Sequence, residues 1–188
     1  MVKVAILGFG VVGSGVAEVL SGNGAGIQKK ADELIEVKYI LDVRDFPDSP
    51  FAQHFVKDFS VIEHDPEVNV VVETIGGVGA ALDFTERALK QGKSVVTSNK
   101  ELVATHGRRL LDLAAQNNAV YLFEASVGGG IPILRPLSEC MSANEILEIC
   151  GILNGTANYI FTRMVKDHVP FAEALAGAQA NGYAEQDP

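Results

Sequence analysis

The sequence predicts an α/β fold, in which a doubly wound parallel sheet is followed by the beginning of a second, α+β unit. Three observations carry this prediction. Short apolar segments alternate with helical patterns over the first two thirds of the chain, as in successive βαβ units. The run Val70–Val72 is apolar throughout, which is typical of a strand buried on both faces of a parallel sheet. After Phe123 the alternation stops, and a glycine-rich segment follows.

The elements of the first part follow from this pattern in chain order. Strands are expected at Val2–Leu7, Glu36–Leu41, Val70–Val72, Ser94–Thr97 and Ala119–Phe123. Helices are expected at Val12–Leu20, Leu82–Gln91 and Leu102–Asn117, with a break at Ser21–Gly26 and a short helix among the loops of residues 45–66. Gly92 directly follows the second helix, where a left-handed residue commonly ends a helix.

The second part is shorter and differently organised. We assign residues 1–130 to the first domain and residues 131–188 to the second. In the second, helices are expected at Ile133–Met141, Tyr159–Lys166 and Phe171–Ala180, with a strand at Ile146–Leu153. This part has too few strands to close a core by itself, and residues 185–188 resemble the middle of a motif, so we expect the chain to be a fragment.

Composition excludes several classes of protein. The net charge of −9 argues against a nucleic-acid partner, because binding phosphate backbones requires a basic face. No run of eighteen apolar residues is present and the first strand begins at the N-terminus, so we expect neither a membrane span nor a signal peptide, and a cytoplasmic location. Cys140 and Cys150 lack a metal-binding spacing and are expected to be free, buried thiols.

The first expected strand runs directly into a G-x-G-x-x-G motif, Gly8 to Gly13, and a helix follows. In such a motif Gly8 permits the tight turn, Gly10 lets the backbone approach a pyrophosphate, and Gly13 lets the helix pack closely on the strand. The pyrophosphate would then lie on free N–H groups at the positive end of the helix. The motif predicts a Rossmann-like dinucleotide site, with a glycine-rich turn of another α/β protein as the alternative.

Two further loops follow expected strands at the same edge of the sheet. In Leu41-Asp42-Val43-Arg44-Asp45 an acidic residue would hold a ribose 2′-hydroxyl, whereas Arg44 could accept a 2′-phosphate, so the choice between NAD and NADP stays open. A solvated turn is the alternative. In Thr74-Ile75-Gly76-Gly77 the glycines would let the backbone come close to the cofactor, or they only make a turn.

Lys100 belongs to the segment Thr97-Ser98-Asn99-Lys100-Glu101, which follows a strand and opens a helix. Ser98 and Glu101 have the capping-box spacing, so Ser98 is expected to be the N-cap and Lys100 to lie in the first turn. A cation is locally unfavourable there, and a broken local rule at the ligand-binding edge of a sheet points to function. We expect Lys100 to meet the substrate or the nicotinamide; the alternative is a side chain that extends into solvent.

Glu124 ends the last expected strand before the glycine-rich loop. A carboxylate with free backbone carbonyls nearby can make an oxygen-only cage for a hard cation. The alternative is a glycine-rich hinge between the domains, which would show the same sequence pattern.

Several motifs together are similar to those of homoserine dehydrogenases. They are Gly8–Gly13, Glu73–Gly77, Thr97–Lys100, Glu124–Pro132, Gly151–Ile160 and Gly182–Glu185. The resemblance extends over the whole chain, and the segments after Phe123 are more specific than the glycine motif. It implies NAD- or NADP-dependent interconversion of aspartate 4-semialdehyde and L-homoserine, a step toward threonine, methionine and isoleucine. It also implies that the second domain begins a catalytic and dimerisation domain, and that the intact enzyme is a homodimer.

The resemblance also implies roles for individual residues. The expected cofactor-binding residues are Gly8, Phe9, Gly10, Val11, Val12, Gly13, Arg44, Thr74, Ile75, Gly76, Thr97, Ser98, Lys100 and Gly182. Lys100 and Glu185 are the expected catalytic residues, and Glu185 is the expected substrate contact. A monovalent cation, usually sodium, would be held by Glu124, Val127, Gly129 and Ile131. The family's proton-donating lysine would follow Glu185 and is absent from this chain, so turnover by the chain itself is doubtful.

Two rival functions stay open at this point. The first is another Rossmann dehydrogenase of a related amino acid, such as aspartate dehydrogenase, which activity with homoserine against aspartate would distinguish. The second is a non-catalytic nucleotide-binding module, which would bind the cofactor without turnover.

Overall fold

The computed structural model describes residues 1–141, 143–151 and 154–184. The chain divides into two compact units, Met1–Gly129 and Gly130–Pro188. Each unit is described by itself.

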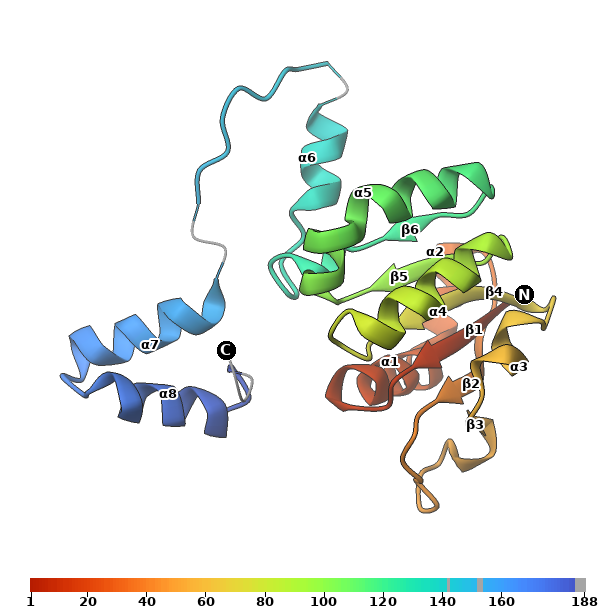
Figure 1. Ribbon diagram of the computed structural model, residues 1–188, viewed down its shortest axis with the longest axis horizontal. Coiled ribbons are helices and arrows are strands. Elements are labelled where there is room, and N and C mark those ends of the chain that lie inside the picture. Colours follow the sequence, from red (N-terminus) through yellow and green to blue (C-terminus); the bar gives the residue numbers. More distant parts are fainter. Residues whose placement is uncertain (142, 152–153, 185–188) are drawn as a thin grey trace. The chain divides into compact units, whose positions relative to one another are not determined.

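The first unit is built on a six-stranded sheet with the strand order β3-β2-β1-β4-β5-β6. The strands are β1 (Val2–Leu7), β2 (Ile35–Leu41), β3 (Phe55–Val56), β4 (Val68–Glu73), β5 (Ser94–Thr97) and β6 (Tyr121–Leu122). All neighbouring strands pair in parallel. The chain runs outward from β1 to β3, returns to β4 beside β1, and runs outward again to β6 (Figure 1). This topology confirms the predicted doubly wound fold and places its switch point between β1 and β4.

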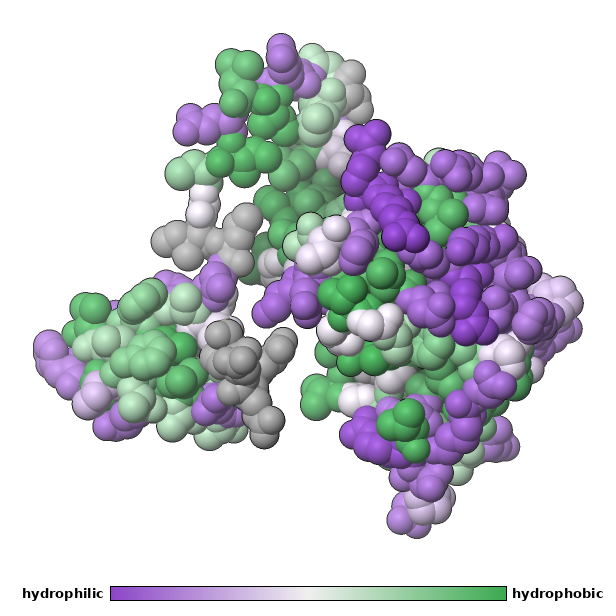
Figure 2. Space-filling model, viewed as in Figure 1, coloured by the Kyte–Doolittle hydropathy of each residue, from purple (hydrophilic) through white to green (hydrophobic). Residues whose placement is uncertain are grey.

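Helices cover both faces of the sheet. They are α1 (Val11–Gly22), α2 (Gly24–Ala31), α3 (Phe59–Glu63), α4 (Gly79–Lys90) and α5 (Lys100–Gln116), with the short 3₁₀ helices η1 (Ala52–His54) and η2 (Glu124–Ser126). In Figure 1, α4 and α5 lie side by side in front of the sheet. Hydrophilic side chains cover most of their outward surface, as Figure 2 shows.

Two hydrophobic cores follow from the alternation of side chains along β1. Ala5 and Leu7 belong to the core under α3, α4 and α5, whereas Val4 and Ile6 belong to the core under α1. Successive side chains of a strand point to opposite faces, so an apolar run of this kind supplies both layers at once.

The turn from β1 into α1 depends on two glycines. Gly8 has φ +92°, a left-handed conformation that side chains rarely adopt. A Cβ on Gly13 would lie 1.9 Å from the carbonyl oxygen of Gly8 and 2.9 Å from the Thr74 hydroxyl. The close packing of α1 on the sheet therefore requires glycine at position 13.

We expect Gly13→Ala to lower the free energy of unfolding by about 2 kcal/mol or more, because a methyl group cannot fit without moving the backbone of Gly8. Urea unfolding followed by circular dichroism measures this loss. Gly15→Ala is the matched control, since a Cβ at Gly15 meets no atom within 4 Å. Equal unfolding midpoints for the two variants would contradict the prediction.

The sequence pattern misses helix α2 and strand β3 of this unit. Helix α2 occupies part of the segment expected to be a break, and it buries no residue, so its sequence shows no apolar face. Strand β3 is two residues long and pairs with Ile40 and Leu41 of β2. A segment this short has no recognisable period.

The second unit contains the helices α6 (Leu134–Cys140), α7 (Gly155–Lys166) and α8 (Phe171–Ala180). Helices α7 and α8 pack together around Ile160, Ala174 and Ala178. Asn154 is the N-cap of α7, and its side chain accepts a hydrogen bond of 2.8 Å from the N–H of Ala157.

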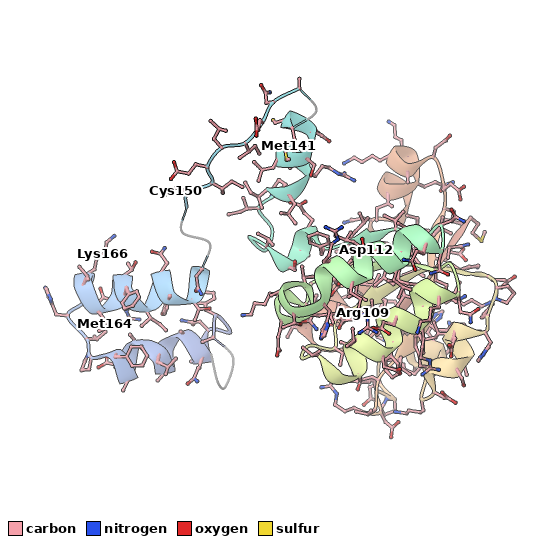
Figure 3. The ribbon with its side chains drawn as sticks, turned by 45° about the horizontal axis from the view of Figure 1, so that its top comes forward. Arg109, Asp112, Met141, Cys150, Met164 and Lys166 are labelled. Atoms are coloured by element: carbon pink, nitrogen blue, oxygen red, sulfur yellow. The ribbon has the colours of Figure 1, made fainter. Side chains whose placement is uncertain are left out.

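The strand expected at Ile146–Leu153 is wrong for residues 146–151, which are irregular, and residues 152–153 lie outside the described residues. A strand needs a partner for its backbone groups, and the second unit offers none among its described residues. The expected burial of the two cysteines is also wrong. Cys140 and Cys150 are free but exposed, and Cys150 lies in the segment that follows α6 (Figure 3).

Candidate functional site

The glycine loop lies between β1 and α1, at the carboxyl edge of the sheet next to its switch point. Gly10 is the N-cap of α1, and a Cβ at this position would meet no atom within 4 Å. Gly8 and Gly13 are thus required by the fold, whereas Gly10 faces open space. The backbone N–H groups in the first turn of α1 have no partner within the helix, and Val11 is 92% exposed beside them. This loop can receive an anion that needs backbone donors and close approach.

A cleft of about 380 Å³ opens beside the glycine loop. The predicted cofactor residues that line it are Gly8, Gly10, Arg44, Thr74 and Ile75. Asp42, Lys57 and Phe84 line it as well. The structure therefore brings together loops that follow β1, β2 and β4, as expected for a site at the switch point of a doubly wound sheet.

The side chain of Phe9 packs into an aromatic cluster with Phe46, Phe51 and Phe55. Its ring centroid lies 5.0 Å from that of Phe55 and 5.1 Å from that of Phe46. The ring of Phe9 is thus held by contacts with three other aromatic rings. The cluster fixes the glycine loop against the loop that follows β2.

Arg44, predicted to accept a 2′-phosphate, binds Asp42, one of the two acidic residues in the segment 41–45. Arg44 Nε and Nη2 donate to the Asp42 carboxylate over 3.0 and 2.9 Å, and the Phe9 N–H donates to it over 2.7 Å. The pKa of Asp42 lies well below its usual range, mainly because of the hydrogen bonds from the Arg44 side chain. The Arg44 side chain is still 59% exposed and lies over the ring of Phe46. Asp42 therefore orients Arg44 at the rim of the cleft.

Lys57 is a cation at this rim that the sequence did not indicate. Its ammonium group donates to the carbonyl oxygens of Asp42, Val43 and Arg44, over 3.1, 3.1 and 2.6 Å. It also forms an ion pair of 2.8 Å with Asp45. Lys57 follows β3, and only the pairing of β3 with β2 brings it here. No local sequence signal could have found it.

Thr74 connects the loop after β4 to the glycine loop. Its N–H donates to the Leu7 carbonyl over 2.9 Å, and its hydroxyl lies 2.9 and 3.0 Å from the carbonyl oxygens of Leu7 and Gly8. Gly76 and Gly77 follow with φ values of +82° and +65°. The loop after β4 therefore turns sharply where β4 ends beside β1.

The start of α5 differs from the expected capping box. Asn99, not Ser98, is the N-cap, and its side-chain oxygen accepts from the Leu102 N–H over 3.0 Å. Thr97 is 1% exposed, and its hydroxyl donates to a neighbouring carboxylate rather than lining the cleft. Lys100 is the first residue of α5, in the first turn as predicted. The sequence does not distinguish Ser98 from Asn99, because both are good N-cap residues and tertiary contacts select between them.

Two other predicted residues lie near the C-terminal end of the chain. Gly182, with φ +72°, ends α8 in the second unit, and Glu185 lies outside the described residues. The predicted cation ligands occupy both units: Glu124, Val127 and Gly129 in the first, and Ile131 in the second. Among the described residues, no three His, Cys, Asp or Glu side chains gather as metal ligands, and none of the helices has the length and hydropathy of a membrane span.

Comparison with known families gives two matches that divide the chain. Residues 8–124 match the NAD-binding domain of homoserine dehydrogenase, and residues 132–188 match a homoserine dehydrogenase domain.

Individual relatives agree with these matches. Homoserine dehydrogenase of Pseudomonas aeruginosa is 42% identical over 100% of this chain and 43% of its own length. The crystal structure of a homoserine dehydrogenase from Thiobacillus denitrificans has a TM-score of 0.87 at 36% identity, over 100% of this chain and 44% of that one. A hyperthermophilic archaeal homoserine dehydrogenase in complex with NADPH has a TM-score of 0.82 at 26% identity, over 100% of this chain and 63% of that one.

The chain thus spans less than half of the length of the curated relatives it matches. It belongs to the homoserine dehydrogenase family.

Proposed function

We propose that the full-length protein interconverts aspartate 4-semialdehyde and L-homoserine with NADP(H) or NAD(H), and that this chain supplies its cofactor site. The observation that carries the proposal is the open position at Gly10, next to the free N–H groups of α1 and at the switch point of the sheet. The cradle fits a pyrophosphate, since it offers donors and no side chain in the way. When bound, the nicotinamide would supply or accept the hydride.

The chain's own residues would then act by positioning and by electrostatics. Gly10 and the first turn of α1 would hold the pyrophosphate. Arg44 and Lys57, both lining the cleft, would face the adenosine ribose and favour a 2′-phosphate. Lys100 would hold the substrate and stabilise the oxygen on which negative charge develops during hydride transfer. Glu185 would contact the substrate.

Three finer proposals rest on the family resemblance alone. Glu124 and the backbone carbonyls of Val127, Gly129 and Ile131 would hold a monovalent cation, sodium. The intact enzyme would be a cytoplasmic homodimer. Its product would lead toward threonine, methionine and isoleucine.

Steady-state kinetics of the full-length protein test the main proposal. We expect NAD(P)⁺ reduction with L-homoserine and none with aspartate. Activity with aspartate instead would identify a related amino-acid dehydrogenase. Binding of NADPH to the full-length protein without turnover of either substrate would identify a nucleotide-binding module.

The Arg44 side chain offers a test of cofactor preference. We expect Arg44→Ala to weaken NADPH binding by about tenfold or more, because a charge-assisted hydrogen bond to the 2′-phosphate is lost. NADH has no such phosphate, and its affinity should stay within about twofold. Fluorescence titration of both cofactors measures the difference. Arg108→Ala is the control, since Arg108 is an exposed arginine paired with Asp112 on α5. Equal losses for both cofactors would show that Arg44 acts only through its pairing with Asp42.

A further inference from the structure

Glu73 is a buried carboxylate at the carboxyl end of β4, and none of the functional assignments above uses it. It is the last residue of β4, lies opposite Leu7 of β1 and Thr97 of β5, and is 0% exposed. A charged group is expensive to bury unless hydrogen bonds compensate for the lost water. Its partners therefore show what the carboxylate does.

The hydrogen bonds of Glu73 reach two different loops. Oε1 accepts from the N–H groups of Ile75, over 2.8 Å, and Gly76, over 3.4 Å. Oε2 accepts from the hydroxyl of Thr97 over 2.6 Å. One carboxylate thus holds the loop after β4 with one oxygen and the end of β5 with the other.

These bonds belong to a closed ring. The Thr97 hydroxyl oxygen accepts from the Asn99 N–H over 2.9 Å. The Asn99 side-chain amide donates to the carbonyl oxygen of Gly77 over 2.6 Å, which returns to the loop that Glu73 holds. Asn99 is also the N-cap of α5, so the ring includes the residue directly before Lys100.

The donors that surround position 73 favour an acceptor with two oxygens there. Backbone N–H groups only donate, and the Thr97 hydroxyl, which accepts from Asn99, has a single proton to give. A glutamine would place its NH₂ group against either the Thr97 hydroxyl or the N–H groups of the loop. Against the loop N–H groups, a donor would face a donor. Against Thr97, the hydroxyl could accept from the NH₂ group only by turning its own proton away from position 73. Either arrangement leaves a buried donor unpaired, which costs more than the loss of one bond.

We propose that Glu73 is a positioning residue that fixes the loop of residues 74–77 and the start of α5 relative to each other, and so holds the cofactor-binding loop in register with Lys100. The inference rests on the proposed function for what the two loops bind. The relative position of the two loops is set by hydrogen bonds within the chain and needs no ligand. Thr74, directly after Glu73, connects the same frame to the glycine loop.

The test uses the 188-residue chain and four variants. Glu73→Gln keeps the shape and removes the charge, Thr97→Val removes the hydroxyl, and Thr97→Ser keeps it. The double variant combines Glu73→Gln with Thr97→Val. The measurements are amide hydrogen exchange of Ile75, Asn99 and Leu102 by NMR without cofactor, and fluorescence titration with NADPH.

Two controls match the chemistry of these changes. Thr85 is 0% exposed, and within the described part of the chain its hydroxyl has no hydrogen-bond partner, so Thr85→Val makes the Thr97→Val change without breaking the ring. Glu86 pairs with Arg109, labelled on α5 in Figure 3, over 2.6 Å. Glu86→Gln therefore removes a carboxylate charge from α4 outside the ring.

We expect Glu73→Gln and Thr97→Val each to lower the exchange protection of Ile75 and Asn99, and to weaken NADPH binding, by about tenfold or more. Their effects should not add in the double variant, because both changes break the same contact. Thr97→Ser should restore both properties, and the two controls should leave both unchanged. If Glu73→Gln fails to fold, the Thr97→Val and Thr97→Ser pair decides the question.

Three results would overturn the proposal: unchanged protection of Ile75 and Asn99, failure of Thr97→Ser to restore it, or an equal loss in Thr85→Val. If the parent chain binds neither NADPH nor NADH, the proposed function fails, and the exchange measurements still decide whether Glu73 holds the two loops.

Discussion

Gly10→Val is expected to fold like the parent chain and to bind NADPH at least about 100-fold more weakly. The fold should survive because a Cβ at Gly10 meets no atom within 4 Å, and its φ of −81° and ψ of −162° suit a β-branched residue. Binding should fail because the added methyl groups occupy the space in which the pyrophosphate reaches the N–H groups of α1. Several charge-assisted hydrogen bonds are lost together, which accounts for the size of the effect.

Fluorescence titration with NADPH and thermal unfolding of the same samples separate the two halves of this prediction. Gly15→Val is the matched control: it adds the same side chain further along α1, again where a Cβ meets no atom within 4 Å. Parent-like NADPH affinity in Gly10→Val would show that the cofactor does not bind at this loop. A large loss of stability would show that Gly10, like Gly13, is required by the fold.

Most of the first unit was predictable because its signals are local. Val70–Val72 lies within β4, and the all-apolar run reports burial on both faces of the sheet. The glycine motif specifies a strand, a turn and a helix within a few residues, and the structure has β1, the turn at Gly8 and α1 in that order. The topology then followed, because alternating strands and helices leave few arrangements of a parallel sheet.

The parts that were missed depend on residues far apart in the sequence. Lys57 reaches the cleft through the pairing of β3 with β2, and Glu73 has Thr97 as its partner only because β4 lies beside β5. The cap of α5 shows the same limit on a smaller scale. Ser98 and Asn99 both suit an N-cap, and Asn99 takes the position while its amide donates to Gly77.

The second unit was less predictable for a different reason. A run of apolar residues predicts a strand only if other strands accept its backbone hydrogen bonds. Within residues 146–151 the chain is irregular, and Leu147 and Ile149 are 89% and 67% exposed. Because no strand pairs with this segment among the described residues, its apolar pattern does not produce a strand.

Lys100→Ala is expected to lower kcat/KM of the full-length enzyme by at least about 100-fold, through lost positioning of the substrate and lost stabilisation of the developing negative charge. The same substitution should change the free energy of unfolding by less than about 0.5 kcal/mol. Lys100 is the exposed first residue of α5, where a cation opposes the helix dipole and alanine is well tolerated. The expected result is thus an asymmetry between folding and catalysis.

Steady-state kinetics and thermal unfolding of one variant test both halves of that asymmetry. Lys90→Ala is the control: Lys90 lies in the last turn of α4, at the opposite end of that helix from the cofactor edge, so its loss should leave kcat/KM unchanged. NADPH affinity should stay near that of the parent if Lys100 acts mainly on the substrate. Full activity of Lys100→Ala, or a fall in stability as large as that expected for Gly13→Ala, would make Lys100 a structural residue. A functional residue is expected to contribute nothing to the stability of its helix, or to lower it, and yet to be required for turnover.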